Sequence, residues 1–440
     1  MENQVGLKKG AVNSIWYTAI YGCSLISPGM CIGGIIGYVA GMTGLSLVLA
    51  MLLAGLINYL WVVNYANLVQ KFPRCGCHYT YIREGLNPSL GFLLGWGVLP
   101  VYIFACGAHV IVFGGYFQSL FPQIPFFVIA VLYMVMIAAI SIRGIKLTTV
   151  IGVVLFSTET LILLALSLTA IGVTWPTWTE IAPQMFWPHS PWTWGTVAIA
   201  TTVCVYNYIG FASITGLVEE STPSLVSKGM YISVAIVTVV YVIASMGIVL
   251  AWPDAGSLAK ETEPLVNAGK VFWNKYWPFV TLAVLISTTT CSLACINLGA
   301  RMMYDMSRDG CLPSWLGKIH PKYQTPWSAL VFSAFFYVIA ALWIPYIYQI
   351  ECIVFVMLLA YIGVALANIR VSWDDPSMKN TILNKILPAL GIVLSVYLLL
   401  QTSKMGLLLG GGWMVFSALF TLYLYIFKRQ SLENLDISEM

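Results

Sequence analysis

Long stretches without a charged residue dominate the hydropathy pattern of this chain. Residues 10–70 contain no Asp, Glu, Lys or Arg, and neither do residues 85–142. A helix that crosses the hydrocarbon core needs about 20 mostly apolar residues, so each stretch can hold two spans. The whole pattern predicts an all-α integral membrane protein with twelve transmembrane helices, at 13–36, 44–70, 87–118, 125–142, 148–172, 194–218, 228–251, 276–301, 325–344, 349–369, 385–402 and 405–427.

Two of the predicted helices contain residues that disfavour a helix near the middle of the bilayer. Ser27-Pro28-Gly29 interrupts the first, and Asn207-Tyr208-Ile209-Gly210 interrupts the sixth. An unpaired backbone group in hydrocarbon costs several kcal/mol, so such breaks are tolerated where the backbone lines a cavity or binds something. Breaks at corresponding places in two halves of a chain indicate a solute site at the midplane of a transporter built from inverted repeats. The alternative is that Pro28 and Gly29 only kink a packed helix.

Composition excludes a soluble domain. Hydrophobic residues make up 59% of the 440 residues and charged residues 9%, and the mean hydropathy is +0.86. The residues before the first helix show no cleavable signal pattern, so we expect that helix to serve as its own insertion signal, and we expect residues 1–440 to form a single membrane domain. We expect no disulfides among the ten cysteines, and ordinary thiols rather than a metal site at Cys75 and Cys77.

The basic residues predict the orientation in the membrane. If the N-terminus is cytoplasmic, all of the 21 Lys and Arg residues fall on the inner side except Lys260, Lys270, Lys275 and Lys404. This bias is typical of cytoplasmic loops, so both termini of this multi-pass plasma membrane protein are expected in the cytoplasm. The net charge of +4 requires no nucleic-acid partner. The expected partners are a small-molecule solute and the lipid bilayer, with the chain as a monomer or a homodimer.

Several segments resemble a known family. Glu219-Glu220-Ser221-Thr222-Pro223 follows the sixth helix, and the segment from Arg301 to Pro313, which contains Ser307-Arg308-Asp309-Gly310, follows the eighth. Together with Thr325-Pro326, Ile209-Gly210-Phe211 and the spacing Pro73, Gly76, Tyr79, Tyr81, these segments resemble the amino acid–polyamine–organocation superfamily of permeases. The resemblance implies a leucine-transporter-like fold of 5+5 inverted repeats. Helices 1–5 would occupy 13–172, helices 6–10 would occupy 194–369, and two extra helices would occupy 385–427.

A helix break offers sites for both ends of a zwitterion. The half-helix that begins there exposes N–H groups, and the half-helix that ends there exposes carbonyls. The resemblance implies that an amino acid's carboxylate would be held at Ser27 and Gly29, and its ammonium at Tyr206, Asn207 and Ile209. It also implies that Gly210 belongs to this site and that Cys106 lines it.

Two positions depart from the family pattern. Pro28 replaces the Ser of the usual Gly-Ser-Gly in the first helix, and proline offers neither an N–H nor a hydroxyl. Ala212 stands where some relatives carry a Glu, which weakens the case for exchange of cationic amino acids. A weaker anion subsite beside aromatic side chains would favour an amine or a methylated ammonium, because aromatic faces attract cations by roughly 0.5–2 kcal/mol.

Glu159 is the one carboxylate that we expect near the centre of the bilayer. A charge there costs at least about 2.5–3.5 kcal/mol, so such residues usually face a pathway or a partner. We expect the hydroxyls of Ser287 and Thr288, followed by those of Thr289 and Thr290, to be its neighbours. Two interpretations remain open, one in which Glu159 couples transport to protons or sodium, and one in which it is a permanently protonated hydrogen-bonding residue.

Other polar residues carry weaker signals. His109 lies one turn from Cys106 and either contacts the solute or packs between helices as a satisfied histidine. Arg301 with Asp305, and Arg308 with Asp309, are expected to pair in a cytoplasmic loop, either to lock an inward gate or to cap a helix.

We expect a secondary active permease for a small amino acid or an amino-acid-derived zwitterion or cation. It would work by alternating access, with proton or sodium coupling or exchange and without a cofactor. An amine or methylated-ammonium permease of the same fold is the first alternative. The twelve-helix architecture of two six-helix halves predicts a charged loop motif that Lys71 to Arg83 lacks. A channel would lack paired broken helices, and a membrane-embedded enzyme would require clustered acidic or histidine residues, whereas only His109 and Glu159 are available.

Overall fold

The computed structural model describes residues 13–252, 254–261 and 263–428, and these residues form helices joined by short connections. The helices are α1 (Ile15–Ile26), α2 (Pro28–Thr43), α3 (Leu47–Lys71), α4 (His78–Gly85), α5 (Pro88–Leu120), α6 (Phe126–Ile142), α7 (Ile145–Thr174), α8 (Trp178–Phe186), α9 (Trp194–Val205), α10 (Pro223–Ala251), α11 (Ala255–Leu258), α12 (Pro264–Trp273), α13 (Trp277–Arg308), α14 (Trp327–Trp343), α15 (Tyr346–Val371), α16 (Met378–Thr381), α17 (Leu387–Leu400) and α18 (Lys404–Phe427). A 3-10 helix, η3 (Tyr206–Leu217), continues directly from α9.

Nine segments of the described chain are long and apolar enough to cross a membrane. The first runs from Ile15 to Lys71 and holds α1, α2 and α3, and two shorter apolar helices, α6 and α14, accompany the nine. Each of the twelve ranges predicted from the sequence falls on one of these helices, with α1 and α2 together forming the first and α9 with η3 forming the sixth.

α2 runs to Thr43 instead of ending at residue 36, and two further helices are extended at ends where polar contacts, which hydropathy does not report, stabilise them. α10 begins at Pro223, where Pro occupies the first turn and the side chain of Thr222 accepts a hydrogen bond from the amide of Leu225. α13 continues past the predicted end to Arg308, and its last turns carry buried charged residues.

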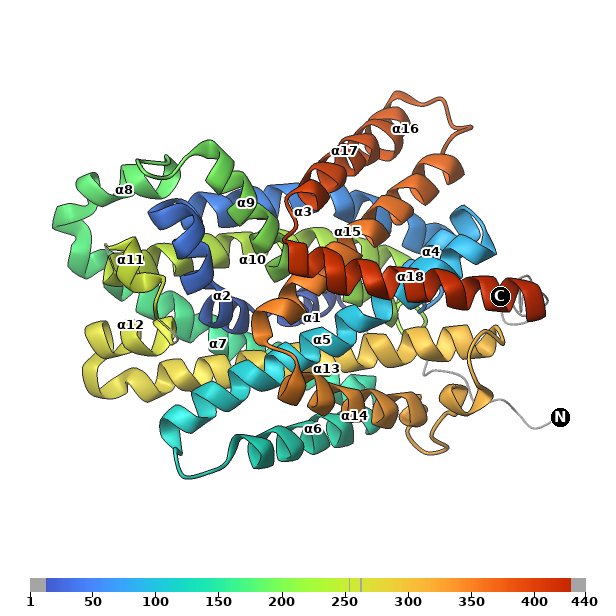
Figure 1. Cartoon of the computed structure of the whole chain (residues 1–440), viewed down its shortest axis with the longest axis horizontal. Coiled ribbons are helices and arrows are strands. Elements are labelled where there is room, and N and C mark those ends of the chain that lie inside the picture. Colours follow the sequence, from blue (N-terminus) through green and yellow to red (C-terminus); the bar gives the residue numbers. More distant parts are fainter. Residues whose placement is uncertain (1–12, 253, 262, 429–440) are drawn as a thin grey trace.

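The long helices run roughly along the long axis of the molecule, with α1 near the centre (Figure 1). α1 packs against α7, α10, α13 and η3, and α5 packs along α13. α17 and α18 pack on α15 at one side of the molecule. The last turn of α18 lies at the right-hand end of the view, opposite α8, α11 and α12.

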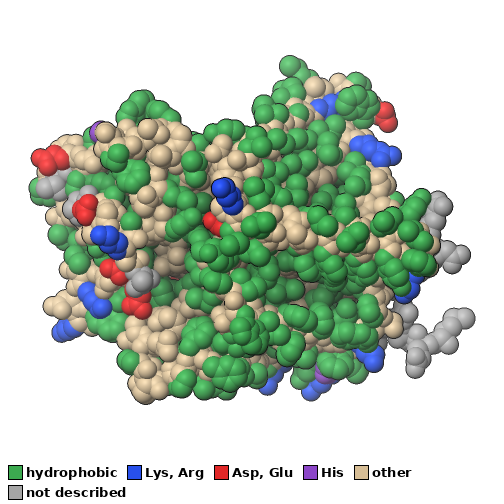
Figure 2. All heavy atoms as spheres, viewed as in Figure 1, with side chains coloured by type: hydrophobic (Ala, Val, Ile, Leu, Met, Phe, Trp, Pro, Cys, Tyr) green, Lys and Arg blue, Asp and Glu red, His purple; other side chains and the backbone are tan. Residues whose placement is uncertain are grey.

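Charged side chains gather mainly toward the two ends of the long axis, and the surface between them is largely hydrophobic (Figure 2). Large apolar side chains on this surface are strongly exposed, including Leu161 at 70%, Leu400 at 77% and Phe427 at 71%. Exposed apolar surface of this extent is typical of contact with lipid rather than with water.

Candidate functional site

The first interruption is a single residue that separates two helices. Ser27 adopts a left-handed conformation with φ 48° and ψ 75°, and its N–H donates to the carbonyl of Cys23 at 3.0 Å, which ends α1. Pro28 occupies the first position of α2, where a missing N–H costs no helical hydrogen bond. The interruption predicted at Ser27-Pro28-Gly29 is therefore present.

Groups of the protein already use the amides at the start of α2. Met30 donates its N–H to the Ser287 hydroxyl at 2.8 Å, and Cys31 donates its N–H to the carbonyl of Ser27 at 3.2 Å. The Ser27 hydroxyl lies 3.0 Å from the Thr290 hydroxyl. In this conformation the Met30 N–H and the Ser27 hydroxyl face helix α13, and the amides of Met30 and Cys31 have partners within the protein.

The two interrupted helices are joined through Tyr241 on α10. Its hydroxyl lies 3.0 Å from the carbonyl oxygen of Ile26, at the end of α1, and 2.8 Å from that of Asn207, at the start of η3. The carbonyl of Leu25 accepts a hydrogen bond from the Cys291 thiol at 3.2 Å. Side chains therefore satisfy carbonyls that the helix ends leave without helical partners.

The second interruption differs from the prediction. The sixth helix does not unwind at Asn207, and it tightens from α-helix to 3-10 helix at Tyr206 and keeps that form to Leu217. Runs of 3-10 helix longer than three or four residues are uncommon and often mark a hinge. The backbone therefore stays hydrogen-bonded along its own axis. The side chain of Tyr206 lies outside the described part of the structure.

A small cavity lies between the two interruptions, with a volume of about 30 Å³. It brings together the predicted residues Asn207, Ile209 and Gly210, and its full lining is Leu25, Ile26, Cys31, Val101, Tyr102, Ala105, His109, Asn207, Ile209, Gly210, Ser213, Cys291, Cys295 and Ile353. The predicted residues Ser27, Gly29 and Cys106 are outside this lining. A volume of this size holds little more than one or two water molecules, so the cavity is too small for a larger solute in this conformation.

Glu159 on α7 lies beside the first interruption and is fully buried. Its neighbouring polar groups are the Ser287 hydroxyl and the Gly29 N–H, although neither carboxylate oxygen reaches hydrogen-bond distance of a described group. Ser287 is thus placed where the sequence predicts it. Thr288 instead donates its hydroxyl within its own helix, to the carbonyls of Val284 at 3.0 Å and Leu285 at 2.9 Å.

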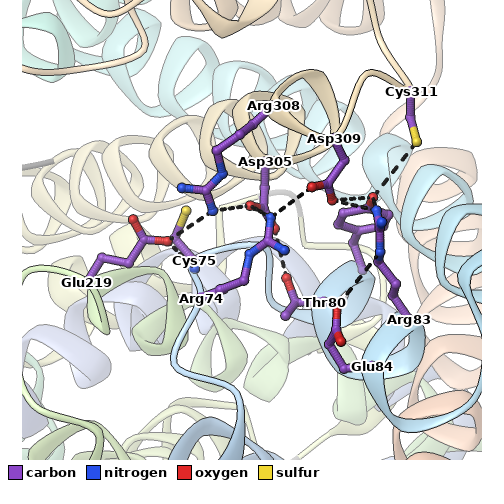
Figure 3. A network of polar contacts seen from close by, with 11 residues as sticks. Arg74, Cys75, Thr80, Arg83, Glu84, Glu219, Asp305, Arg308, Asp309 and Cys311 are labelled. Carbon is purple, nitrogen blue, oxygen red and sulfur yellow. Dashed lines mark hydrogen bonds and ion pairs between the residues drawn. The ribbon is translucent and has the colours of Figure 1, made fainter. Parts of the chain in front are cut away.

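Buried ion pairs link the segment from Arg74 to Arg83 to the C-terminal end of α13 (Figure 3). Arg74 lies 2.6 Å from Asp305 and 3.1 Å from Asp309, and Arg83 lies 2.6 Å from Asp309. Thr80 donates its hydroxyl to Asp305 at 2.8 Å. The side chains of both Asp residues are completely inaccessible to solvent, so the network joins the α3–α4 region to α13 without water between them.

The ion pairs predicted from the sequence are wrong. Arg301 pairs with Glu220 at 2.7 Å rather than with Asp305. Arg308 pairs with Asp305 at 2.5 Å and with Glu219 at 3.6 Å, and not with Asp309. The Arg308–Asp305 pair is local, at i,i+3, whereas Arg301–Glu220 and Arg308–Glu219 join α13 to the segment before α10, so buried charges lie beside opposite charges from both the same and another element.

The sequence of residues 18–369 matches the model of the family described as amino acid permease. The chain belongs to the amino acid permease family. This membership agrees with the resemblance found in the motifs, and it excludes an enzyme.

Characterised relatives of this family member differ in their solutes. The low-affinity putrescine importer PlaP of Escherichia coli (strain K12) is 28% identical over 301 residues, which cover 66% of each chain. The methylthioribose transporter of Bacillus subtilis (strain 168) is 27% identical over 64% of each chain, and the branched-chain amino acid permease BcaP of the same strain is 24% identical over 81% of each. The matched segment spans just under two thirds of the length of PlaP.

A solved structure shows the same overall fold. The outward-open, substrate-bound state of a Na⁺-coupled sialic acid symporter superposes with a TM-score of 0.58 over 91% of each chain, at 12% identity. At this identity the likeness concerns the fold alone. The chain is thus a multi-pass membrane protein of the amino acid permease family.

The sequence signals missed two groups of buried polar residues in this permease family member. In the sequence, Arg74 and Arg83 look like ordinary basic residues of a cytoplasmic loop. Gly76, which lies between them, marks a close contact, because a Cβ atom there would lie 2.1 Å from a carboxylate oxygen of Asp305. His78 lies 3.0 Å from the hydroxyl of Tyr102, which lines the cavity. Burial lowers the pKa of His78 to about 3, so this histidine is neutral.

Proposed function

We propose that this protein is a secondary active permease that carries a small amino-acid-derived solute across the cytoplasmic membrane by alternating access. The observation that carries the proposal is the cavity between the two interrupted helices, which buried ion pairs separate from one end of the bundle. A solute site with a closed gate on one side is one of the two states that alternating access requires. A saturable, ligand-specific flux follows from this arrangement, whereas a channel would give a non-saturating flux.

We propose twelve spans in a 5+5 arrangement. The Ile15–Lys71 segment has 57 residues and turns around near Gly44, so it supplies two spans, and α6 and α14 add two more to the remaining eight. The first repeat would comprise 13–172, the second 194–369, and the peripheral helices α17 and α18 would be the extra pair at 385–427.

The solute is held mainly through its positive end. Asn207 lines the cavity, and its side-chain carbonyl oxygen is buried and has no hydrogen-bond partner among the described groups. A buried unpartnered acceptor costs about 1–3 kcal/mol until a ligand donates to it, and an ammonium group is a suitable donor. The Tyr102 and His109 side chains complete the polar wall.

A carboxylate subsite is correspondingly weak. Pro28 has no N–H, and the amides of Met30 and Cys31 are already bonded within the protein. This favours the second candidate, an amine permease, for solutes that lack a carboxylate. The similarity to a putrescine importer supports the same candidate.

We assign the coupling role to Glu159. Of the ion pairs among the described residues none includes Glu159, and its carboxyl group is completely buried beside Gly29 and Ser287. A carboxylate in such a place must take up a proton or a cation, because an uncompensated buried charge costs several kcal/mol. Its contact with the first interruption would link that event to the movement of α1 and α2.

The test is uptake into proteoliposomes. The purified protein is reconstituted into vesicles that are loaded with one unlabelled solute. Uptake of labelled putrescine, leucine or methylthioribose in exchange for that solute is then measured with and without a proton or sodium gradient. We expect saturable uptake of one of these classes that is inhibited by its close analogues. Flux that never saturates, or no flux of any amine or amino acid despite a folded protein, would contradict the proposal.

The orientation is tested separately. Ser257 and Ser314 are both exposed, and they lie in connections that the proposal places on opposite sides of the membrane. In a background without native cysteines, Ser257→Cys in intact cells should react with an impermeant reagent and Ser314→Cys should not. The reverse pattern would invert the proposed topology.

A further inference from the structure

We propose that Cys106, His109 and Cys295 form a binding site for one thiophilic metal ion of the Zn²⁺ class. One ligand atom from each side chain lies within 4.8 Å of the other two, and all three residues are buried. Cys106 and His109 are one turn apart on α5, and Cys295 faces them from α13, the helix that packs along α5. Two thiols and an imidazole are the ligand set that such ions prefer.

The geometry requires only a small contraction. Zinc binds sulfur at about 2.3 Å and imidazole nitrogen at about 2.0–2.1 Å, so tetrahedral ligands lie roughly 3.5–3.8 Å from one another. The ligand atoms of Cys106, His109 and Cys295 are within about 1 Å of that spacing.

A second layer of hydrogen bonds orients the histidine. The Nδ1 atom of His109 lies 3.2 Å from the Ser292 hydroxyl, and this hydroxyl accepts a hydrogen bond from Tyr133 at 2.9 Å. A metal-binding histidine usually donates its other ring N–H to such a partner, which fixes the ring and the tautomer. With Nδ1 held by Ser292, Nε2 is the nitrogen available to a metal.

The site faces the cavity and remains electrically neutral. His109 and Cys295 line the cavity, so the fourth position around the ion is open to water there. Binding releases one proton from each of the two thiols, and the two thiolates then neutralise the two positive charges of the ion. A neutral complex avoids the cost of a net charge at membrane depth.

Metal binding should block transport. The ion would fasten α5 to α13 and fill a cavity of about 30 Å³. The block rests on the proposed function, whereas binding of the ion does not. The two parts therefore need separate measurements.

The binding test uses Cd²⁺ as the probe on the full-length protein in detergent, with a phosphine reductant to keep thiols reduced. Titration should show thiolate-to-cadmium absorption that saturates at one ion per chain, competes with Zn²⁺ and strengthens as the pH rises. Cys106→Ser, Cys295→Ser and His109→Asn should each weaken binding by more than about ten-fold, and Ser292→Ala by about ten-fold. Thermal unfolding without metal identifies any variant that fails to fold.

Matched controls use buried cysteines elsewhere. Cys204→Ser, Cys352→Ser and the double variant Cys75→Ser, Cys77→Ser should bind Cd²⁺ as the wild type does. Binding that survives Cys295→Ser, or that disappears in the Cys75 and Cys77 double variant, would overturn the site. In proteoliposomes Zn²⁺ should inhibit wild-type uptake and spare Cys106→Ser, whose residue lies outside the cavity lining, and binding without inhibition would overturn the block. A wild type that shows no uptake but still binds Cd²⁺ would count against the proposed function and leave the site standing.

Discussion

Gly210 lies directly against the backbone of Leu25. A Cβ atom on Gly210 would come within 2.3 Å of the Leu25 carbonyl oxygen and 2.9 Å of the Ile26 amide nitrogen, and distances this short essentially never occur. The two interrupted helices therefore touch through their main chains at the edge of the cavity. Only glycine permits this approach, because every other side chain begins with a Cβ atom.

Gly210→Ala should destabilise the bundle. The added methyl group must push η3 away from α1, and overpacking of this kind costs about 1–3 kcal/mol. Thermal unfolding of the purified protein should show a lower midpoint, with loss of uptake. Gly172→Ala is the matched control, since a Cβ at Gly172 meets nothing within 4 Å and should leave both unchanged. Equal stability of the two variants would show that the helices separate without cost.

Glu159→Gln should separate transport from its driving ion. The amide fits the space of the carboxylic acid and cannot gain or lose the charge, so folding should be retained while uptake no longer responds to a proton or sodium gradient. Exchange of solute without a gradient should continue. Glu180→Gln on α8 alters an exposed carboxylate and should behave as wild type. Gradient-driven uptake that persists in Glu159→Gln would assign Glu159 a structural role.

Pro28→Ser should shift preference toward solutes with a carboxylate. The substitution restores an N–H and a hydroxyl beside Gly29, and a hydrogen bond to a charged group contributes about 1.5–3 kcal/mol. Competition between an amino acid and its decarboxylated amine should change by roughly ten- to a hundred-fold in favour of the amino acid. Pro88→Ser, at the first turn of α5, is the control. A wild type that strictly requires the carboxylate, with an unchanged ratio in Pro28→Ser, would refute the argument from missing donors.

Asp309→Asn should open the end of the bundle that the ion pairs close. The change leaves Arg74 and Arg83 without one buried counter-charge, and removing one partner of a buried pair costs about 3–5 kcal/mol. Cys75, which is completely buried beside this network, serves as the reporter. Its reaction with a maleimide should become faster by at least about ten-fold, whereas the exposed substitution Asp375→Asn should have no effect. Unchanged labelling in Asp309→Asn would mean that the network does not form the gate.

The gate should open more readily as the pH rises, because Glu220, which pairs with Arg301 at 2.7 Å, follows Glu219, whose carboxylate accepts a hydrogen bond from the Cys75 N–H at 2.9 Å beside the gate. Burial raises the pKa of Glu220 from 4.5 to about 7, while Arg301 acts to lower it. The closed gate therefore binds a proton more strongly than an open, hydrated gate in which the pKa returns toward 4.5. The stabilisation that protonated Glu220 gives to the closed gate is therefore fully present below about pH 4.5. It is lost as the pH rises through about 7.

Labelling of Cys75 measures this pH dependence. The rate of Cys75 labelling in the wild type is divided by the rate in Glu220→Gln, so that the thiol's own pH dependence cancels. This ratio should increase between pH 5 and pH 7.5. Each pH unit in that window contributes up to a factor of about ten. A ratio that stays flat would show that Glu220 keeps its charge throughout.

Local features of the sequence determined the helices and the first interruption. Hydropathy over some 20 residues reports whether a segment can lie in lipid, and Pro28 with Gly29 limits the backbone within a few residues. Both properties belong to short stretches of chain, so the positions of the helices and the break at Ser27 could be predicted. The motif around Arg301 to Pro313 likewise indicated the family, which the match over residues 18–369 bears out.

The tertiary structure decided which residues meet. Arg83 and Asp309 are 226 positions apart, and Ser27 and Thr290 are 263 apart, so no local pattern pairs them. Packing of α7, α10 and α13 around α1 also placed Glu159 beside Gly29, and the sixth helix continues as the 3-10 helix η3. The sequence contains residues that are compatible with a buried charge or a close backbone contact. Only the folded bundle determines the partner of each residue, because the partners depend on the distances between helices that are far apart in the chain.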